Sequence, residues 1–222
     1  MVMLSRLPAC IVGWTCVSSI KTMTSEQAIR WLFKPILFIV CLVPLALFIF
    51  DAFNDNLSPD PIEDATLFTG EWTIRFLLVT LAVTPLRKLT GIAKIVQFRR
   101  MLGLYAFFYA TLHFLVWFWL DRELALAEVL SDIVKRPYIT VGFTAFILLI
   151  PLAVTSNRYS IRRLGRRWQS LHKLVYVIAV LGVLHFLWLV KADVLEPVIY
   201  GLLLLGLLVS RAWWQRRANK FN

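Results

Sequence analysis

The chain is poor in cysteine and in charge, and it lacks the glycine motifs that bind nucleotides. Its three cysteines, Cys10, Cys16 and Cys41, form no CxxC pair, so there is no disulfide framework, zinc knuckle or iron–sulfur signature. Neither GxGxxG nor GxxxxGK[ST] occurs, and the loops between apolar runs are too short for a nucleotide-binding domain. Any redox partner or substrate must therefore come from outside this chain.

Hydrophobic residues make up 59% of the chain and charged residues only 17%. A soluble domain carries more charge and less apolar content, so this composition indicates an integral membrane protein. The net charge of +11 does not indicate nucleic-acid binding, because the basic residues lie in blocks between apolar runs and form no separate basic domain.

Six apolar segments are long enough, or nearly so, to cross a bilayer as helices of roughly 20 residues. The second is short and would have to tilt little or extend to Leu89 and Ile92. The predicted fold is therefore an all-α, integral membrane six-helix bundle. The segments are Trp31–Phe50, Trp72–Leu86, Leu102–Leu120, Tyr138–Thr155, Leu171–Val190 and Val194–Ser210.

The charges of the connecting loops predict the orientation of the bundle. Residues 51–70 contain five acids and no Lys or Arg, and residues 121–137 are mixed and slightly acidic. Residues 87–101 and 156–170 each contain five basic residues and no acid, and the tail is also basic. By the positive-inside rule, both termini are predicted to be cytoplasmic.

The first 22 residues fit the bundle poorly. Ile11–Ile20 is too short to span, and although Arg6 precedes it as in a signal peptide, no small-x-small cleavage site follows. We expect residues 1–22 to be a disordered extension from an upstream start codon, and residues 23–222, beginning at Met23, to form the transmembrane domain.

The only three histidines, His113, His172 and His185, all lie in apolar runs. A polar ring is costly in a membrane unless it has a partner, and in a helix bundle haem iron is a common partner for imidazole. His113 lies eight residues before Asp121 and His185 six before Lys191, or about 12 Å and 9 Å along a helix. The two rings are thus predicted at one depth, on two helices, and can ligate one haem iron.

Roles without a metal also remain open for these histidines. A membrane histidine can simply bond to a neighbouring helix, whereas a proton relay would need intramembrane acids, and none lies deep in the spans. His172 and His185 are thirteen residues apart, which places them about 140° apart around an ideal helix. Both can face the bundle only if the helix tilts, kinks or bulges, and Gly182, which lies between them, would permit such an irregularity.

No fourth histidine exists to pair with His172. A haem there needs a different second ligand or is five-coordinate, or else His172 contacts a flavin, a quinone or a haem propionate. Arg75 lies three residues into the second segment. It is expected either to extend to the lipid headgroups or to pair with a haem propionate, since the arginine fork suits a carboxylate.

Three stretches carry a resemblance to a known family: RRMLGLYAFFYATLHF (99–114), LGRRWQSLHKLVYVIAVLGVLHF (164–186) and GEWTIRFLLVTLAVTPLRKL (70–89). Together they resemble the haem-binding membrane subunits of bacterial periplasmic methionine-sulfoxide reductase systems, within the ferric-reductase-like transmembrane proteins. The similarity covers residues 23–222, and His113, His172 and His185 match the three histidines of the family.

The resemblance implies a b-type cytochrome of the bacterial inner membrane with one or two haems b, and FMN is also associated with the family. Electrons would come from the quinone pool or a cytosolic flavin reductase. They would pass to a periplasmic molybdopterin enzyme that reduces methionine sulfoxide in oxidised proteins. The alternatives are a related haem reductase with another acceptor, such as ferric iron, and a haem-free transporter. An electron-transfer subunit is expected, not an autonomous enzyme.

Overall fold

The computed structural model describes residues 27, 29–190 and 194–220, and no strand occurs among them. The predicted extension at residues 1–22 lies outside the described residues. Six helical stretches are long and apolar enough to cross a membrane, in agreement with the predicted six segments. They are Ile29–Phe53, Pro61–Thr90, Ala93–Asp121, Pro137–Val154, Arg166–Leu189 and Leu195–Arg217.

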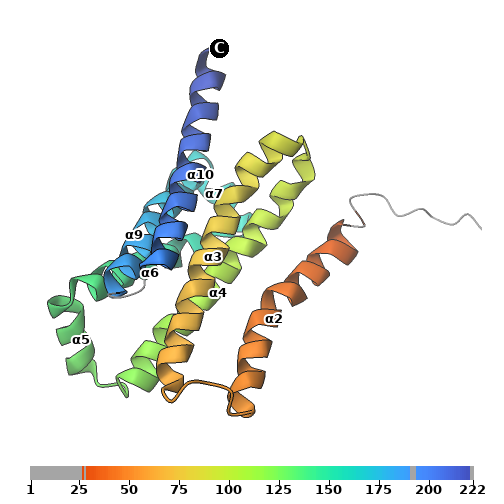
Figure 1. Ribbon diagram of the computed structural model, residues 1–222. Helices are drawn as coiled ribbons and strands as arrows, with labels where there is room; N and C mark the ends of the chain where they lie inside the picture. Colours follow the sequence, from red (N-terminus) through yellow and green to blue (C-terminus); the bar gives the residue numbers. More distant parts are fainter. Residues whose placement is uncertain (1–26, 28, 191–193, 221–222) are drawn as a thin grey trace, which may run out of the picture. The chain divides into compact units, whose positions relative to one another are not determined.

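The elements follow one another with short connections (Figure 1). Two π-helical stretches, η1 and η3, and one 3₁₀ stretch, η2, join or extend the α-helices. In chain order they are η1 (Ile29–Phe33), α2 (Lys34–Phe53), α3 (Pro61–Thr90), η2 (Ala93–Phe98), α4 (Arg99–Leu115), η3 (Val116–Asp121), α5 (Leu126–Lys135), α6 (Pro137–Val154), α7 (Arg158–Leu164), α8 (Arg166–His172), α9 (Leu174–Leu189) and α10 (Leu195–Lys220).

Helix α3 begins about eleven residues earlier than the apolar pattern predicted. The Asp60 side chain accepts hydrogen bonds from the backbone N–H groups of Ile62 and Glu63, and Pro61 occupies the first turn, where its missing N–H costs nothing. At the other end, Gly91 ends the helix in the left-handed conformation at φ 72°. The second span therefore needs no residues borrowed from beyond Thr90.

The predicted fifth segment is two helices. Helix α8 ends at His172, Lys173 forms a turn, and α9 then continues to Leu189. The expected irregularity therefore falls at Lys173 and not at Gly182, which lies within regular helix. As a result, His172 and His185 belong to different helices.

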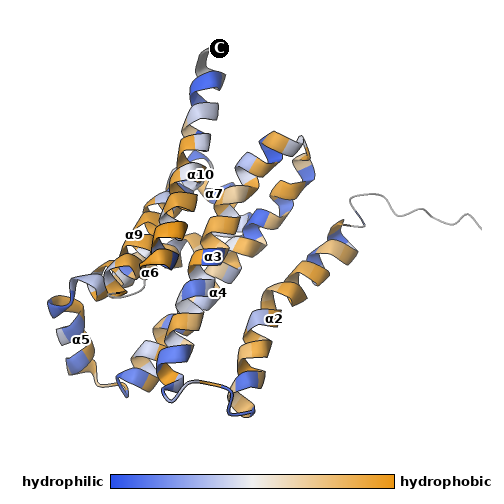
Figure 2. Cartoon of the chain, viewed as in Figure 1, coloured by the Kyte–Doolittle hydropathy of each residue, from blue (hydrophilic) through white to orange (hydrophobic). Residues whose placement is uncertain are grey.

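The described residues divide at Ile39 and Val40 into two compact units, and the second contains every feature discussed below. In it, α3 packs along α4 and α6 packs along α9, while α10 contacts both α3 and α9 (Figure 1). Hydrophobic residues cover most of α6 and α9, and hydrophilic residues gather towards loops and helix ends (Figure 2). Large apolar side chains such as Leu202 and Val209 on α10 are exposed, as expected where lipid replaces water as the solvent.

Candidate functional site

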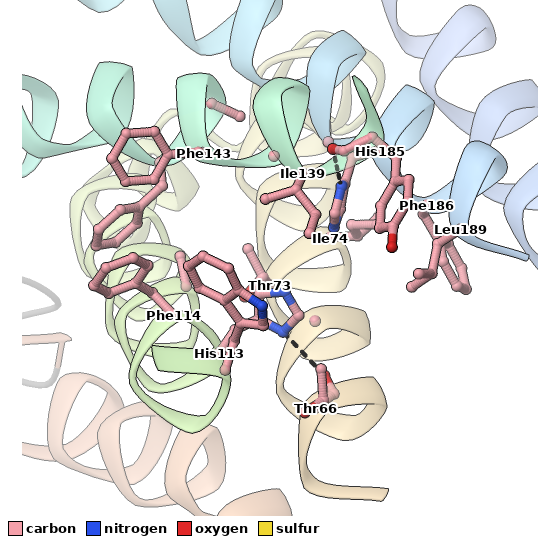
Figure 3. Close-up of a pocket in the computed structure, with 18 of the residues that line it drawn as sticks. Thr66, Thr73, Ile74, His113, Phe114, Ile139, Phe143, His185, Phe186 and Leu189 are labelled. Atoms are coloured by element: carbon pink, nitrogen blue, oxygen red, sulfur yellow. Dashed lines mark hydrogen bonds between the residues drawn. The ribbon is translucent and has the colours of Figure 1, made fainter. Parts of the chain in front are cut away.

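A cavity of about 290 Å³ lies among α3, α4, α6 and α9. Its lining is mostly aliphatic and aromatic, and His113 of α4 and His185 of α9 both contribute to it (Figure 3). Apolar pockets with a few convergent polar groups are the usual form of a cofactor site. The structure thus brings together the two histidines that were predicted to lie at one depth.

The spacing of the two imidazoles suits one metal ion between them. The ring centroids are 6.2 Å apart and the ring planes make an angle of 78°. An imidazole nitrogen lies about 2 Å from a transition metal that it ligates and the ring centre roughly 1 Å further back, so two rings on one metal have centres about 6 Å apart. The observed separation matches that value.

Each ring is held by a backbone carbonyl on a facing helix. The Nδ1 atom of His113 lies 2.9 Å from the Thr66 carbonyl oxygen, and Nδ1 of His185 lies 2.7 Å from the Tyr138 carbonyl oxygen (Figure 3). A carbonyl can only accept, so Nδ1 must carry the proton in both rings. Each Nε2 therefore keeps its lone pair, the form that ligates a metal.

Two glycines make room for these rings. A Cβ atom added to Gly142 would lie 2.7 Å from Nδ1 of His185, and one added to Gly70 would lie 3.1 Å from Cε1 of His113. The first of these contacts is closer than real Cβ atoms approach, and the second is tighter than most. Gly70 and Gly142 each lie four residues after the carbonyl that holds the ring, one helical turn along the same face.

These glycines were not predicted, but the sequence contains a signal for them. Tyr138, Gly142 and His185 follow Thr66, Gly70 and His113 by 72 residues each. The tetrapeptide Leu-His-Phe-Leu also occurs twice at this offset, at 112–115 and 184–187. The α3–α4 and α6–α9 pairs therefore build equivalent halves of the site.

The described residues alone do not complete a metal site here. Among the described residues, no group of three or more His, Cys, Asp or Glu side chains could hold a metal ion. A metal between His113 and His185 needs its remaining ligands from a non-protein group, and a porphyrin supplies four nitrogens in one plane. The donor set, the apolar lining and the space left by Gly70 and Gly142 fit a haem.

His172 does not line the cavity. Its ring stacks on Trp168, with centroids 3.9 Å apart, and Nδ1 lies 3.2 Å from the Trp168 carbonyl oxygen. Its Nε2 is 3.5 Å from the Ser156 hydroxyl. A second site at His172 would thus be separate from the cavity.

Arg75 does not line the cavity either. One of its terminal nitrogens lies 2.7 Å from the Glu71 carboxylate, and its Nε donates to the Tyr200 hydroxyl at 2.8 Å. Its guanidinium also lies over the Trp72 ring, 5.0 Å from the centroid. Glu71, which does line the cavity, was not predicted, because it falls at the edge of the apolar run.

Comparison with known proteins gives a family match over part of the site, including His113 but not His185. Residues 69–183 match the family described as "Ferric reductase like transmembrane component". The chain is 51% identical to the "Protein-methionine-sulfoxide reductase heme-binding subunit MsrQ" of Bordetella pertussis, over 83% of this chain and 91% of that protein. A protein with the same description in Herminiimonas arsenicoxydans is 50% identical over 85% of this chain and 88% of that protein. Another in Xanthomonas campestris pv. campestris strain 8004 is 52% identical over 75% of this chain and 77% of that protein. No solved structure matches.

Proposed function

Because this chain belongs to the MsrQ family of haem-binding subunits, within the ferric-reductase-like transmembrane proteins, we propose that His113 and His185 ligate one b-type haem. The observation that carries the proposal is the pair of imidazoles with centroids 6.2 Å apart, each with Nδ1 bonded to a backbone carbonyl. A haem bound there supplies one-electron redox chemistry. The protein itself sets the distance that the electron crosses, the orientation of the haem and the redox potential of the haem. It therefore acts as an electron-transfer subunit and not as an autonomous enzyme.

The proposed direction of electron flow follows from the loop charges. With both termini cytoplasmic by the positive-inside rule, the paired histidines lie in the outer half of a bacterial inner membrane. The proposed acceptor is a periplasmic molybdopterin methionine-sulfoxide reductase, which docks on the acidic segment 51–64. The proposed donor is the quinone pool or a cytosolic flavin reductase. The basic segments 87–101 and 156–170 would attract an acidic donor or the phosphate of FMN.

The purified protein tests this proposal directly. We expect a reduced b-type optical spectrum, at least one haem per chain, and a low-spin ferric EPR signal from two imidazoles. Ring planes 78° apart leave the iron d orbitals close in energy, so that signal should be of the highly anisotropic type. A colourless protein would contradict the proposal and favour a haem-free transporter, and acid extraction would reveal bound FMN by its fluorescence.

The acceptor can be tested separately from the haem. A related haem reductase with another acceptor, such as ferric iron, would show the same spectrum. Co-purification with a secreted molybdenum enzyme, and reoxidation of the reduced protein by that enzyme, would support the methionine-sulfoxide function. Reoxidation by ferric chelates alone would favour the alternative.

His172 is proposed to serve a second site, as ligand of another haem or as a contact to flavin, quinone or propionate. The His172→Ala variant is expected to retain at least one haem per chain and the anisotropic EPR signal, because its ring lies outside the cavity that holds His113 and His185. Haem analysis and EPR of the purified variant provide the measurement. Loss of all haem from a properly inserted variant would contradict the separation of the two sites.

A further inference from the structure

Two arginines border the cavity at the end where α6 begins. Arg122 directly follows η3, and Arg136 directly precedes α6. Both line the cavity, and among its lining residues they are the only Lys or Arg side chains. Neither was predicted as part of the site, because both lie in a connection whose charges are mixed.

One carboxylate holds the two arginines together. Asp132 of α5 places Oδ2 at 2.8 Å from Nε of Arg122 and Oδ1 at 3.1 Å from Nε of Arg136. The side chains of Asp132 and Arg122 are only 14% and 21% exposed, whereas that of Arg136 is 46% exposed, so the Arg122 ion pair is shielded from water and the Arg136 ion pair is partly open to it. The two guanidinium groups thereby lie beside one carboxylate at the cavity edge, with Nε of Arg122 and Oδ2 of Asp132 in an ion pair whose geometry is not that of a hydrogen bond.

Both arginines have N–H groups that are not engaged by Asp132. A guanidinium has five N–H groups. Beyond Asp132, Arg122 makes one long contact of 3.5 Å to Asp121, and Arg136 makes one of 3.3 Å to the Tyr138 hydroxyl. Their remaining N–H groups have no partner among the described residues. Arg75 differs, since Glu71, Tyr200 and Trp72 already engage it.

We propose that Arg122 and Arg136 bind the two propionate carboxylates of the haem held between His113 and His185. This inference depends on the proposed function. A b-type haem carries both propionates on one edge of the macrocycle, so two fixed cations at one end of the cavity determine how it is oriented. Arginine forks form charge-assisted bonds with carboxylates, and here Asp132 positions the forks before the haem binds.

The inference is tested on the full-length protein with its haem, using Arg122→Gln, Arg136→Gln and the double variant. Lys135→Gln is the matched control, because it removes an equal charge one residue from Arg136 without touching the cavity lining. Three measurements apply: the rate of haem loss to excess apomyoglobin, the propionate bending bands in the resonance Raman spectrum, and the midpoint potential.

The double variant is expected to lose haem at least tenfold faster than the control, with shifted propionate bands. Its midpoint potential should be more negative, because removing positive charge near the iron disfavours the added electron. The Arg122→Lys and Arg136→Lys variants keep the charge but lose the fork, so smaller changes in the same direction are expected even where the glutamine variants fold poorly.

The outcomes separate this inference from the proposed function. If the wild-type protein shows the low-spin EPR signal but the arginine variants match Lys135→Gln in haem loss and propionate bands, the inference is wrong and the haem assignment stands. If the wild-type protein lacks the low-spin signal, both are overturned.

Discussion

The His113→Ala variant is expected to lose the low-spin haem centre. His185 then has no partner across the cavity, so the iron is released or becomes five-coordinate and high-spin. Loss of a group that merely orients a ligand costs roughly 10- to 100-fold in metal affinity, so loss of the ligand itself should lower the haem content of this centre by at least about tenfold. Haem analysis and EPR of the purified variant measure the effect, and His185→Ala should behave alike.

Two controls support that measurement. Thr111→Ala changes the same helix at a residue outside the cavity lining, whose hydroxyl bonds to the Phe107 carbonyl of its own helix, and it should retain the haem. Added imidazole can enter the space left in His113→Ala and should restore part of the low-spin signal. If His113→Ala keeps the full reduced bands and the EPR signal, the ligand assignment is refuted.

The Gly142→Ala variant is expected to reduce the haem content almost as severely, although the new side chain is a single methyl group. Its Cβ would lie 2.7 Å from Nδ1 of His185, so the ring must move away and weaken its 2.7 Å bond to the Tyr138 carbonyl. Removing such an orienting bond costs roughly 10- to 100-fold in metal affinity. Haem per protein and the rate of haem loss measure the change.

A graded glycine series makes this prediction specific. Gly70→Ala should have a weaker effect, because its Cβ would lie 3.1 Å from Cε1 of His113, whereas Gly206→Ala on α10 meets nothing within 4 Å, lies outside the cavity lining and should resemble the wild type. Alanine favours helix over glycine by about 1 kcal/mol, so haem loss in Gly142→Ala cannot come from a weaker helix. Equal haem retention across the series would refute the role of these glycines.

Hydropathy predicted the spans well where a helix faces lipid, and less well where it faces the cavity. Residues 61–70 were assigned to a loop because they precede the apolar run, yet they form the first turns of α3. Thr66 and Thr69 are compatible with helix there because their hydroxyls bond to the carbonyls of Ile62 and Ala65. Some of these polar residues belong to the site. Their polarity is therefore a sign of function, and it is also the reason that hydropathy did not detect the start of the helix.

Helix α5 was missed for a related reason. It is a short helix in a connection, too short to span, and its apolar residues Leu126, Leu130 and Val134 recur at helical spacing. All three are exposed, a pattern typical of a helix lying in the membrane interface. A search for 20-residue apolar runs cannot detect it, although α5 supplies the Asp132 that holds two cavity arginines.

The pairing of His113 with His185 could be predicted from depth alone, because a helix converts residue number into distance along the membrane normal. The carbonyl partners and glycines could not, since they depend on which helices face each other. The break at Lys173 was equally hidden, because no proline or glycine marks it. The sequence therefore predicted which two histidines meet, and packing determined what holds them in place.

The two halves of the site share their ligand arrangement but not their polarity. Glu71 and Phe143 occupy equivalent positions, 72 residues apart, and both line the cavity. One side thus offers an ionisable carboxyl group, and the other offers only a hydrocarbon ring. At this position the Glu71 carboxylate therefore adds a charge to one half of the site that the other half lacks.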